Sequence, residues 1–276
     1  MLVNLKYVLD LAEKGNFCVP AFNVYNMESA MGVIKAAEET KAPIIMQVYP
    51  RLMKEETGYY LAPVVLAAAK RATVPVCFHL DHGPSELETT RSIRYGATGI
   101  MLDGSTLPFE ENIALTKRVV ETCQYLDIQV EGELGHVGTT ADKDMDEFTT
   151  PDDAKKFVEE TGVACLAVAV GTAHGKYKKP PKLDIERIEA IRKATNNTAL
   201  VLHGGSGLSD DDFKNTVREG IAKVNIFTDI CVAGIDAMNE GLERGLSYLE
   251  IRDLKVEKMK EAAKRKMTLF GSNGKC

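Results

Sequence analysis

The histidines of this sequence are few, and each lies in or directly after an apolar run of strand length. The chain has 276 residues and five histidines. The runs VPVCFHLDHG, IQVEGELGHVG, CLAVAVGTAHG and ALVLHGGSG contain His79, His82, His136, His174 and His203. Imidazole is the commonest side-chain ligand of transition metals. Scarce metal-binding residues therefore recur where strands end, which is where α/β barrels keep their active sites.

Acidic side chains accompany the histidines at the same strand ends. In HLDHG, His79 and Asp81 share one face because strand side chains alternate with a period of two, whereas His82 comes where the strand ends. A hydrogen-bonded histidine–aspartate pair in the core is the alternative for this cluster. Glu131 and Glu133 also share a face, and two carboxylates so placed repel unless a cation or a proton lies between them.

Other partners are open to two of these acids. Lys223 could pair with one of the glutamates, and Asp103 either joins the same rim or caps the loop that follows it. His82, His174 and His203 follow three different runs, so they can converge on one point at the end of a closed sheet. Three histidines with an open fourth position are typical of a catalytic zinc site.

Eight apolar runs alternate with stretches of helical period. The runs span residues 17–22, 43–49, 74–80, 99–104, 128–134, 165–171, 199–204 and 222–227. Glu28–Thr40, Phe109–Leu126 and Pro151–Thr161 show the apolar spacing of helices. Alternation of this kind predicts a parallel sheet, and eight repeats predict closure into a (β/α)8 barrel. An open doubly wound sheet is the alternative, but the glycine-rich turn expected after its first strand is absent from FNVYNMES.

A glycine-rich turn follows the seventh run, and a polar segment ends the eighth. Gly204–Gly207 reads GGSG, and Asn225–Thr228 reads NIFT. The loops after the seventh and eighth strands of such barrels commonly bind phosphate through backbone N–H groups and a helix N-terminus. Glycine lets the backbone approach a ligand closely, so we expect a phosphate site here, with a simple tight turn as the alternative.

Composition limits the class of protein. The sequence is 45% hydrophobic and 27% charged, with a net charge of −6, and it has no basic stripe of the kind that binds nucleic acid. Lys255–Lys266 alternates lysine with glutamate and apolar residues, which indicates a solvated amphipathic helix. No apolar run approaches the roughly 20 residues of a membrane helix. Six scattered cysteines indicate free thiols in a reducing compartment, so we expect a cytoplasmic protein.

Ordered blocks along the whole chain resemble the class II, metal-dependent ketose-phosphate aldolases. They are AFNVYNMES, HLDHG, MLDGST, VEGELG, TPDDAKKFVEETGV, LAVAVGTAHGKY, LVLHGGSG and IAKVNIFTD. The resemblance implies a single domain over residues 1–276, an α/β fold of the TIM (β/α)8 barrel type with a C-terminal helical extension. It also implies a divalent metal, commonly zinc (Zn2+).

The resemblance implies roles for the residues that match the family's motifs. The catalytic metal would be bound by His82, His174 and His203. Glu133 and Asp103 match positions that hold a second or displaced divalent ion in some members. Asp81 would be the proton donor to the aldehyde-derived oxygen. Dihydroxyacetone phosphate would be bound by Asn23, Gly175, Gly204, Gly205, Ser206, Asn225, Ile226, Phe227 and Thr228. The segments around Gly175 and Ser206 can also bind a monovalent cation.

The implied reaction is the reversible cleavage of a ketose 1-phosphate or 1,6-bisphosphate into dihydroxyacetone phosphate and an aldehyde. Breaking the C3–C4 bond leaves negative charge that a divalent metal stabilises as a Lewis acid. Asp81 would exchange the proton of the C4 hydroxyl. Oligomers are common in this family, so we expect a homo-oligomer, either a dimer or a tetramer, in which the C-terminal helices supply a contact.

Two segments depart from the family's pattern. Bisphosphate aldolases usually follow ELG-x-x-G with a glycine-rich acidic loop, whose glutamate exchanges the proton at C3. Residues 136–142 read HVGTTAD instead, and the loop acid or base could be Asp142, Asp144 or His136. Many members have a small serine where residues 49–51 read YPR here.

These departures leave alternative functions open. The substrate could be a ketose 1-phosphate that lacks the second phosphate, or the chain could be a non-catalytic barrel that binds sugar phosphates. A barrel aldolase that uses a Schiff-base lysine is a further alternative. Lys223 is the candidate for that lysine, but this reading leaves the three histidines without a role.

Overall fold

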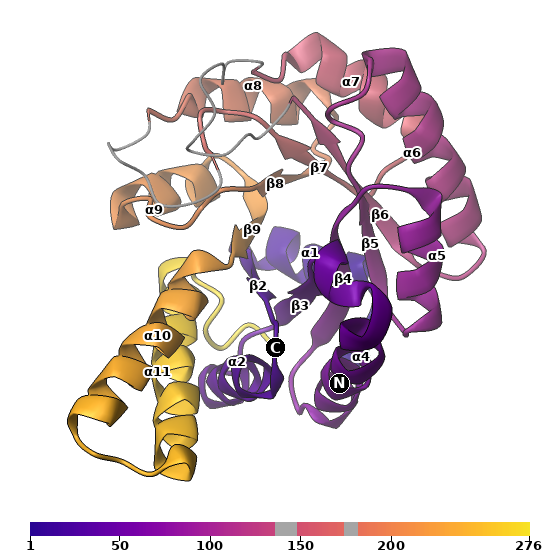
Figure 1. The fold of residues 1–276 in the computed structure, drawn as a ribbon. Coiled ribbons are helices and arrows are strands. Elements are labelled where there is room, and N and C mark those ends of the chain that lie inside the picture. Colours follow the sequence, from indigo (N-terminus) through magenta and orange to yellow (C-terminus); the bar gives the residue numbers. More distant parts are fainter. Residues whose placement is uncertain (136–147, 174–181) are drawn as a thin grey trace.

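A closed ring of parallel strands forms the centre of the molecule (Figure 1). The computed structural model describes residues 1–135, 148–173 and 182–276. Its sheet has nine strands in the order β1-β4-β3-β2-β9-β8-β7-β6-β5, and an additional pairing of β4 with β5 closes the ring. In that pairing His79 lies opposite Gly99. The predicted barrel is therefore confirmed, and the open sheet is excluded.

The eight strands of the ring coincide with the eight predicted apolar runs. From β2 to β9 they are Val19–Asn23, Ile44–Val48, Val76–Gly83, Gly99–Leu102, Gln129–Leu134, Cys165–Val168, Ala199–Leu202 and Ile221–Ile226. The short β1, Leu2–Val3, was not predicted. It lies parallel to the first half of β4, where Leu2 is opposite Val76.

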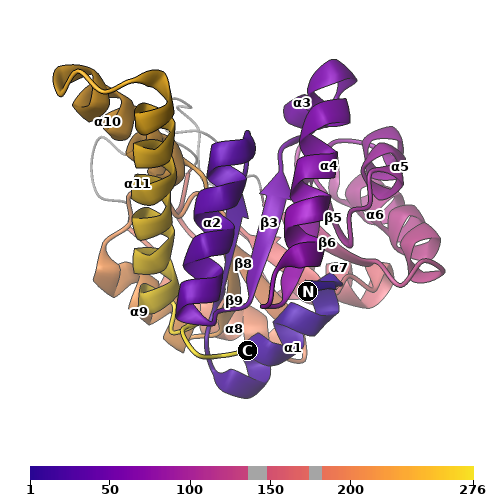
Figure 2. The ribbon, with the colours of Figure 1, turned by 90° about the horizontal axis from the view of Figure 1, so that it is seen from below.

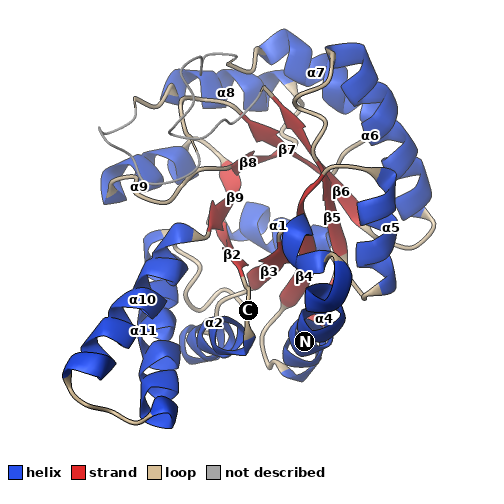
Figure 3. Cartoon of the chain, in the orientation of Figure 1, coloured by secondary structure: helices blue, strands red, loops and turns tan. Residues whose placement is uncertain are grey.

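Helices surround the ring on its outer side (Figure 3). In chain order, α1 to α11 are Leu5–Gly15, Met27–Thr40, Pro50–Met53, Glu55–Arg71, Glu86–Arg94, Phe109–Gln124, Pro151–Thr161, Ile185–Ala194, Asp210–Arg218, Thr228–Glu243 and Tyr248–Leu269. The predicted start of α7 is confirmed, because Thr150 caps the helix and Pro151 opens it. Helix α2 begins with a reciprocal capping box between Asn26 and Ser29.

Helix α1 closes the amino-terminal end of the barrel. Its buried face consists of Leu5, Val8, Leu9 and Ala12. These side chains belong to one apolar cluster with strand residues such as Ile45, Cys77, Cys165 and Val201. This end of the barrel is thus filled with apolar groups, and the polar interior lies towards the carboxyl ends of the strands.

Helix α11 lies outside the ring between α2 and α10 (Figure 2). The face of α11 that packs inward consists of Val256, Met259, Ala263 and Met267. The lysines and glutamates of this helix are exposed or partly exposed, so the amphipathic helix predicted over Lys255–Lys266 is confirmed. Within the described ranges, no helix has both the length and the apolar character that crossing a membrane requires. All six cysteines are free.

Candidate metal centre at the carboxyl end of the barrel

A bulge near the end of β4 brings two consecutive polar side chains into the interior. The backbone of His82 is left-handed, with a φ of 47°, and the pairing with β5 shifts register between Leu80 and Gly83. In a regular strand Asp81 and His82 would point to opposite faces. The bulge re-aims His82, so both side chains reach groups across the barrel.

His82 lies among carboxylates. Its Nδ1 is 2.7 Å from Asp103 Oδ2 and 3.6 Å from Glu133 Oε2. Burial alone would lower the pKa of His82, but the charge of Asp81 and the hydrogen bond that His82 donates to Asp103 raise it to about 10. Asp103 also accepts hydrogen bonds from the backbone N–H and hydroxyl of Ser105. Both predicted roles of Asp103 thus hold, because it caps its loop and contacts His82.

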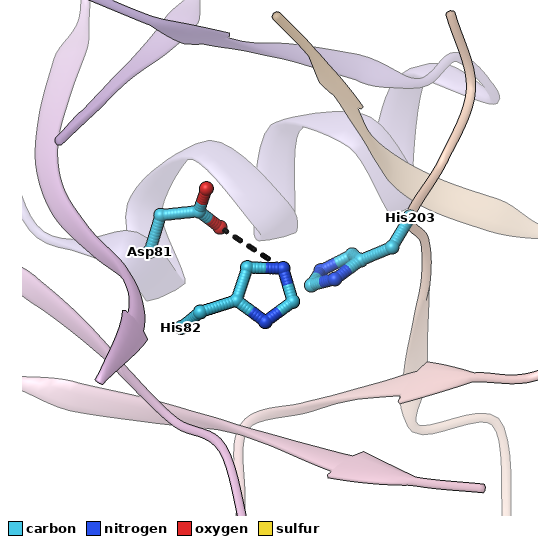
Figure 4. Close-up of side chains that lie close together, drawn as sticks. All are labelled: Asp81, His82 and His203. Carbon is cyan, nitrogen blue, oxygen red and sulfur yellow. Dashed lines mark ion pairs between the residues drawn. The ribbon is translucent and has the colours of Figure 1, made fainter. Parts of the chain in front are cut away.

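His203 follows β8 and meets His82 inside the ring. The centroids of the two imidazoles are 4.6 Å apart and their planes are inclined by 73° (Figure 4). The Nδ1 of His203 is 3.3 Å from Glu133 Oε2, and its Nε2 is 2.9 Å from Glu131 Oε1. Burial opposes a charge on this ring, but its hydrogen bonds to the Glu131 and Glu133 carboxylates raise the pKa of His203. Two of the three histidines predicted to converge therefore do so.

The donor atoms in this cluster fit a divalent cation. One donor atom each from Asp81, His82 and His203 lies within 4.8 Å of the others, and the same holds for His82, Asp103 and Glu133. Imidazole nitrogen and carboxylate oxygen are among the ligands that zinc takes in catalytic sites. Three carboxylates around two imidazoles also leave an excess of negative charge, which a bound cation would neutralise.

Asp81 is held in one orientation by two side-chain amides (Figure 4 shows it beside His82). Asn23 donates from Nδ2 to Asp81 Oδ2 at 2.7 Å, and Asn225 donates to Oδ1 at 2.9 Å. Gln47, which is fully buried, donates in turn to Asn23 Oδ1 at 2.8 Å. Burial alone would raise the pKa of Asp81, but nearby positive groups, first of all His82, lower it. Asp81 is therefore a fixed carboxylate.

A second polar cluster lies deeper in the barrel. The Nζ of Lys223 is 2.8 Å from Glu131 Oε2, and both side chains are fully buried. The alternative in which Lys223 pairs with a glutamate is therefore confirmed for Glu131. His79 Nε2 is 3.3 Å from the same carboxylate oxygen, so His79 lies against Glu131 and not in a pair with Asp81. Burial lowers the pKa of His79, and Lys223 holds the pKa of Glu131 well below its usual range against the effect of burial.

The environment of Lys223 does not suit a Schiff-base lysine. Besides its ion pair, its amine donates a hydrogen bond to Asn225 Oδ1 at 2.7 Å. The side chain has no exposed surface. A nucleophilic lysine must present its amine to a carbonyl carbon of the substrate. This amine is occupied by two buried acceptors instead.

The glycine-rich turn after β8 is sterically required. Gly204 has a φ of 66°, and a Cβ there would lie 2.5 Å from the carbonyl oxygen of Ala173. A Cβ on Gly205 would lie 2.9 Å from Val224 Cγ1. Ser206 is buried in the same turn. The turn after β8 therefore lies directly against the loop after β7.

Helix α9 follows β8, and helix α10 follows β9. Of these two helices, α10 is the better candidate for binding phosphate. Among the described residues no side chain caps its start at Thr228, and Phe227 precedes it half exposed. Helix α9 begins with a capping box and three consecutive acids, Asp210–Asp212, which disfavour an anion. The side chain of Ile226 is fully buried, so only its backbone is available to a ligand.

Some of the predicted site residues lie outside the described ranges, and some residues at the site were not predicted. His174 and Gly175, with His136, Asp142 and Asp144, fall in residues 136–147 and 174–181. Gln47 was not predicted, because one amide in the run IIMQV gives little signal. Tyr49 is half exposed, and its ring centroid is 6.3 Å from that of His82, edge to face. It therefore borders the candidate metal centre.

The fold and the cluster together define a (β/α)8 barrel with a candidate metal site at the carboxyl ends of its strands. The family model for class II fructose-bisphosphate aldolase matches residues 3–275. The chain belongs to the class II fructose-bisphosphate aldolase family.

Individual relatives agree with this assignment. The chain is 40% identical over 279 residues to YdjI of Escherichia coli K12, covering all of this chain and 99% of YdjI. The crystal structure of the E. coli YdjI aldolase superposes with a TM-score of 0.91 at 38% identity, over 100% of this chain and 99% of that one. A fructose-bisphosphate aldolase from Campylobacter jejuni shares the fold, with a TM-score of 0.85 at 24% identity over 100% and 97% of the two chains.

Proposed function

We propose that this protein is a zinc-dependent aldolase. It would reversibly cleave a ketose 1-phosphate or 1,6-bisphosphate into dihydroxyacetone phosphate and an aldehyde. The observation that supports this most directly is the meeting of His82 and His203, whose ring centroids are 4.6 Å apart with Asp81 beside them. Membership of the metal-dependent class II family supports it independently.

The metal would be held by the imidazoles of His82 and His203, with His174 as the third ligand. Glu133 would join them or hold a displaced or second divalent ion with Asp103, which is supported by its distances of 3.3 Å from His203 and 3.6 Å from His82. When bound, zinc supplies a Lewis acid for the negative charge that develops as the C3–C4 bond breaks.

Asp81 would move the proton of the C4 hydroxyl. In the cleavage direction an ionised carboxylate accepts this proton, and in the synthesis direction the same group returns it to the aldehyde-derived oxygen. The lowered pKa of Asp81 leaves it ionised at rest. The amides of Asn23 and Asn225 fix both of its oxygens, so the carboxylate does not need to reorient before it reacts.

The phosphate of dihydroxyacetone phosphate would lie between the loops after β8 and β9. The turn Gly204–Ser206 and the segment Asn225–Thr228 would supply backbone N–H groups and the start of α10. Gly175 belongs to the same proposal by family resemblance, and a monovalent cation could bind near Gly175 and Ser206.

Cytoplasmic location and assembly into a dimer or tetramer complete the proposal. Helix α10 presents exposed apolar side chains, namely Val232, Ile235, Met238 and Leu242, which suit a contact with another copy of the chain. Sedimentation velocity of the purified protein measures this directly. A single monomeric species at micromolar concentration would contradict the oligomer.

The reaction is tested by mixing zinc-loaded protein with dihydroxyacetone phosphate and a panel of aldehydes, with and without a terminal phosphate. We expect a ketose phosphate product, identified by NMR, that disappears after chelation of the metal. Treatment with borohydride and substrate should leave activity intact, because no Schiff base forms. A protein that is stabilised by dihydroxyacetone phosphate but forms no product with any aldehyde would instead be a sugar-phosphate-binding barrel.

A further inference from the structure

A fully buried ion pair inside a barrel requires a physical reason. Glu131 and Lys223 lie 2.8 Å apart on β6 and β9, and neither has any exposed side-chain surface. Removing two charges from water is unfavourable, and apolar residues of similar volume often stabilise a protein as well or better. Barrel interiors are usually filled by branched apolar side chains. Each partner of this pair, however, makes a further hydrogen bond towards the metal centre.

Glu131 determines which nitrogen of His203 faces the candidate metal centre. Its Oε1 is 2.9 Å from His203 Nε2, and an ionised carboxylate can only accept a hydrogen bond. Nε2 therefore carries the proton and donates it. This leaves Nδ1 directed at the cluster, where it is 3.3 Å from Glu133 Oε2. Carboxylates that accept from the far nitrogen of a metal-binding histidine fix both its tautomer and its ring orientation.

Lys223 acts on Asp81 through one intermediate. Its Nζ donates to Asn225 Oδ1 at 2.7 Å, so the amide nitrogen of Asn225 must face the other way. That nitrogen donates to Asp81 Oδ1 at 2.9 Å. Without the lysine the amide could rotate and place its oxygen against the carboxylate, where it would repel Asp81.

We propose that the Glu131–Lys223 pair is a positioning device for both functional parts of the site. Through Glu131 it sets the His203 ring for the metal, and through Lys223 and Asn225 it sets the carboxylate of Asp81 for proton transfer. The inference rests on the proposed function, because it assigns the pair to the same metal centre and the same proton-transfer group.

The experiment must avoid leaving one buried charge alone, since that strongly destabilises a protein. The double variants E131Q/K223M and E131L/K223M both remove the ion pair with little change in volume. They differ in one respect, because the glutamine side chain still offers His203 an oxygen acceptor and the leucine side chain offers none. Circular dichroism and thermal unfolding establish that both fold.

The first measurement is Zn2+ affinity, by competition with a chromophoric chelator. We expect E131L/K223M to bind Zn2+ about 10- to 100-fold more weakly than E131Q/K223M. Equal affinities in the two folded variants would overturn the role of Glu131. Failure of the wild-type protein to bind Zn2+ would instead refute the proposed function. The two outcomes are distinguishable, because only the second affects the wild-type protein.

The second measurement tests the role of Lys223 separately from that of Glu131. At saturating Zn2+ we expect E131Q/K223M to lose roughly tenfold or more in kcat, because Asp81 is no longer held, with little change in KM. Wild-type kcat in this variant would overturn the role of Lys223. A change confined to KM would also overturn it, because it would place Lys223 in substrate binding.

Discussion

The side chains at the mouth of the barrel are organised by charge. Asp81, Asp103 and Glu133 surround His82 and His203, and the charge of Asp81 and its fellow acids raises the pKa of His82 against the effect of burial. The positive charges of His82 and His203 in turn lower the pKa of Asp81 and keep it ionised. Asp81 thus differs from the other two acids, because amides, and not only histidines, hold its oxygens. This is the arrangement expected of a group that moves a proton.

Replacing Asp81 with alanine tests that role. We expect Asp81→Ala to lower kcat by roughly a hundredfold or more, which is the usual contribution of a positioned acid or base. The zinc content of the purified variant, measured by elemental analysis, should stay at the wild-type value because the histidines remain. A folded variant that holds zinc and turns over near the wild-type rate would exclude Asp81 as the proton-transfer group.

Tyr49 offers a test of how substrate is selected. Its ring packs on the edge of His82 and is 48% exposed, so it borders the metal centre without being enclosed. We expect Tyr49→Ser to change the ratio of kcat/KM between short and long aldehydes by about 10- to 100-fold. The zinc affinity should be unchanged.

A second tyrosine provides the control for this test. Tyr59 is 66% exposed, and its ring packs on Tyr60. The same substitution at this position, Tyr59→Ser, removes an identical side chain whose ring packs on Tyr60, and it should leave the aldehyde preference unaltered. Equal effects of the two substitutions would show that Tyr49 has no special part in selection.

Among the elements, the contact between α2 and α11 depends on one glycine. A Cβ on Gly32 would lie 2.9 Å from Met259 Cβ and 3.1 Å from the backbone oxygen of Val256, neither of which can move without shifting the helix. On α10, a Cβ at Gly234 would instead meet Met259 Cε, the mobile end of a flexible side chain. A side chain at Gly32 would therefore clash with α11, whereas one at Gly234 could be accommodated by movement of the Met259 side chain.

These positions make a matched pair of substitutions. Alanine favours a helix over glycine by about 1 kcal/mol at both sites, whereas overpacking costs about 1–3 kcal/mol where neither neighbour can yield. We expect Gly32→Ala to lower the free energy of unfolding and Gly234→Ala to leave it equal or higher, as measured by denaturant unfolding. If Gly32→Ala is the more stable of the two, α2 and α11 are not held at the distance the structure shows.

The strands could be predicted from sequence because their signal is local. Each strand of the ring is an apolar run between helical stretches, and eight such runs favour closure. β1 was not predicted, because two residues are too few to show a period. The left-handed backbone of His82 also has no local signature, since alternation places Asp81 and His82 on opposite faces. The bulge that brings them together depends on pairing with β5.

The sequence indicates which residues are candidates for the site, but not how they pair with one another. The histidines and acids at the strand ends were identifiable because such groups are rare in apolar runs. The pairing of each acid with its positive partner could not be predicted, because Glu131 and Glu133 lie on the same face of one strand. Only the barrel geometry decides that Lys223 reaches Glu131 and that Glu133 lies by the two histidines.

Across the whole molecule, the candidate metal centre joins opposite walls of the barrel. In the ring order, β4 and β8 are four places apart among eight strands, yet His82 and His203 from their ends have centroids only 4.6 Å apart. A cation bound by both rings would cross-link the two sides. Since an unfolded chain cannot offer this arrangement, binding should stabilise the entire fold.

Thermal unfolding with and without Zn2+ measures that cross-link. At a free concentration 100 times Kd, one ion contributes about 2.7 kcal/mol, which raises Tm by about 5–10 °C for a chain of this size. In His203→Gln the amide can still donate to Glu131, but the imidazole is lost, so the zinc-dependent rise should largely vanish. An equal rise in both proteins would mean that zinc binds elsewhere, because the stabilisation would then not require opposite strands to meet at one ion.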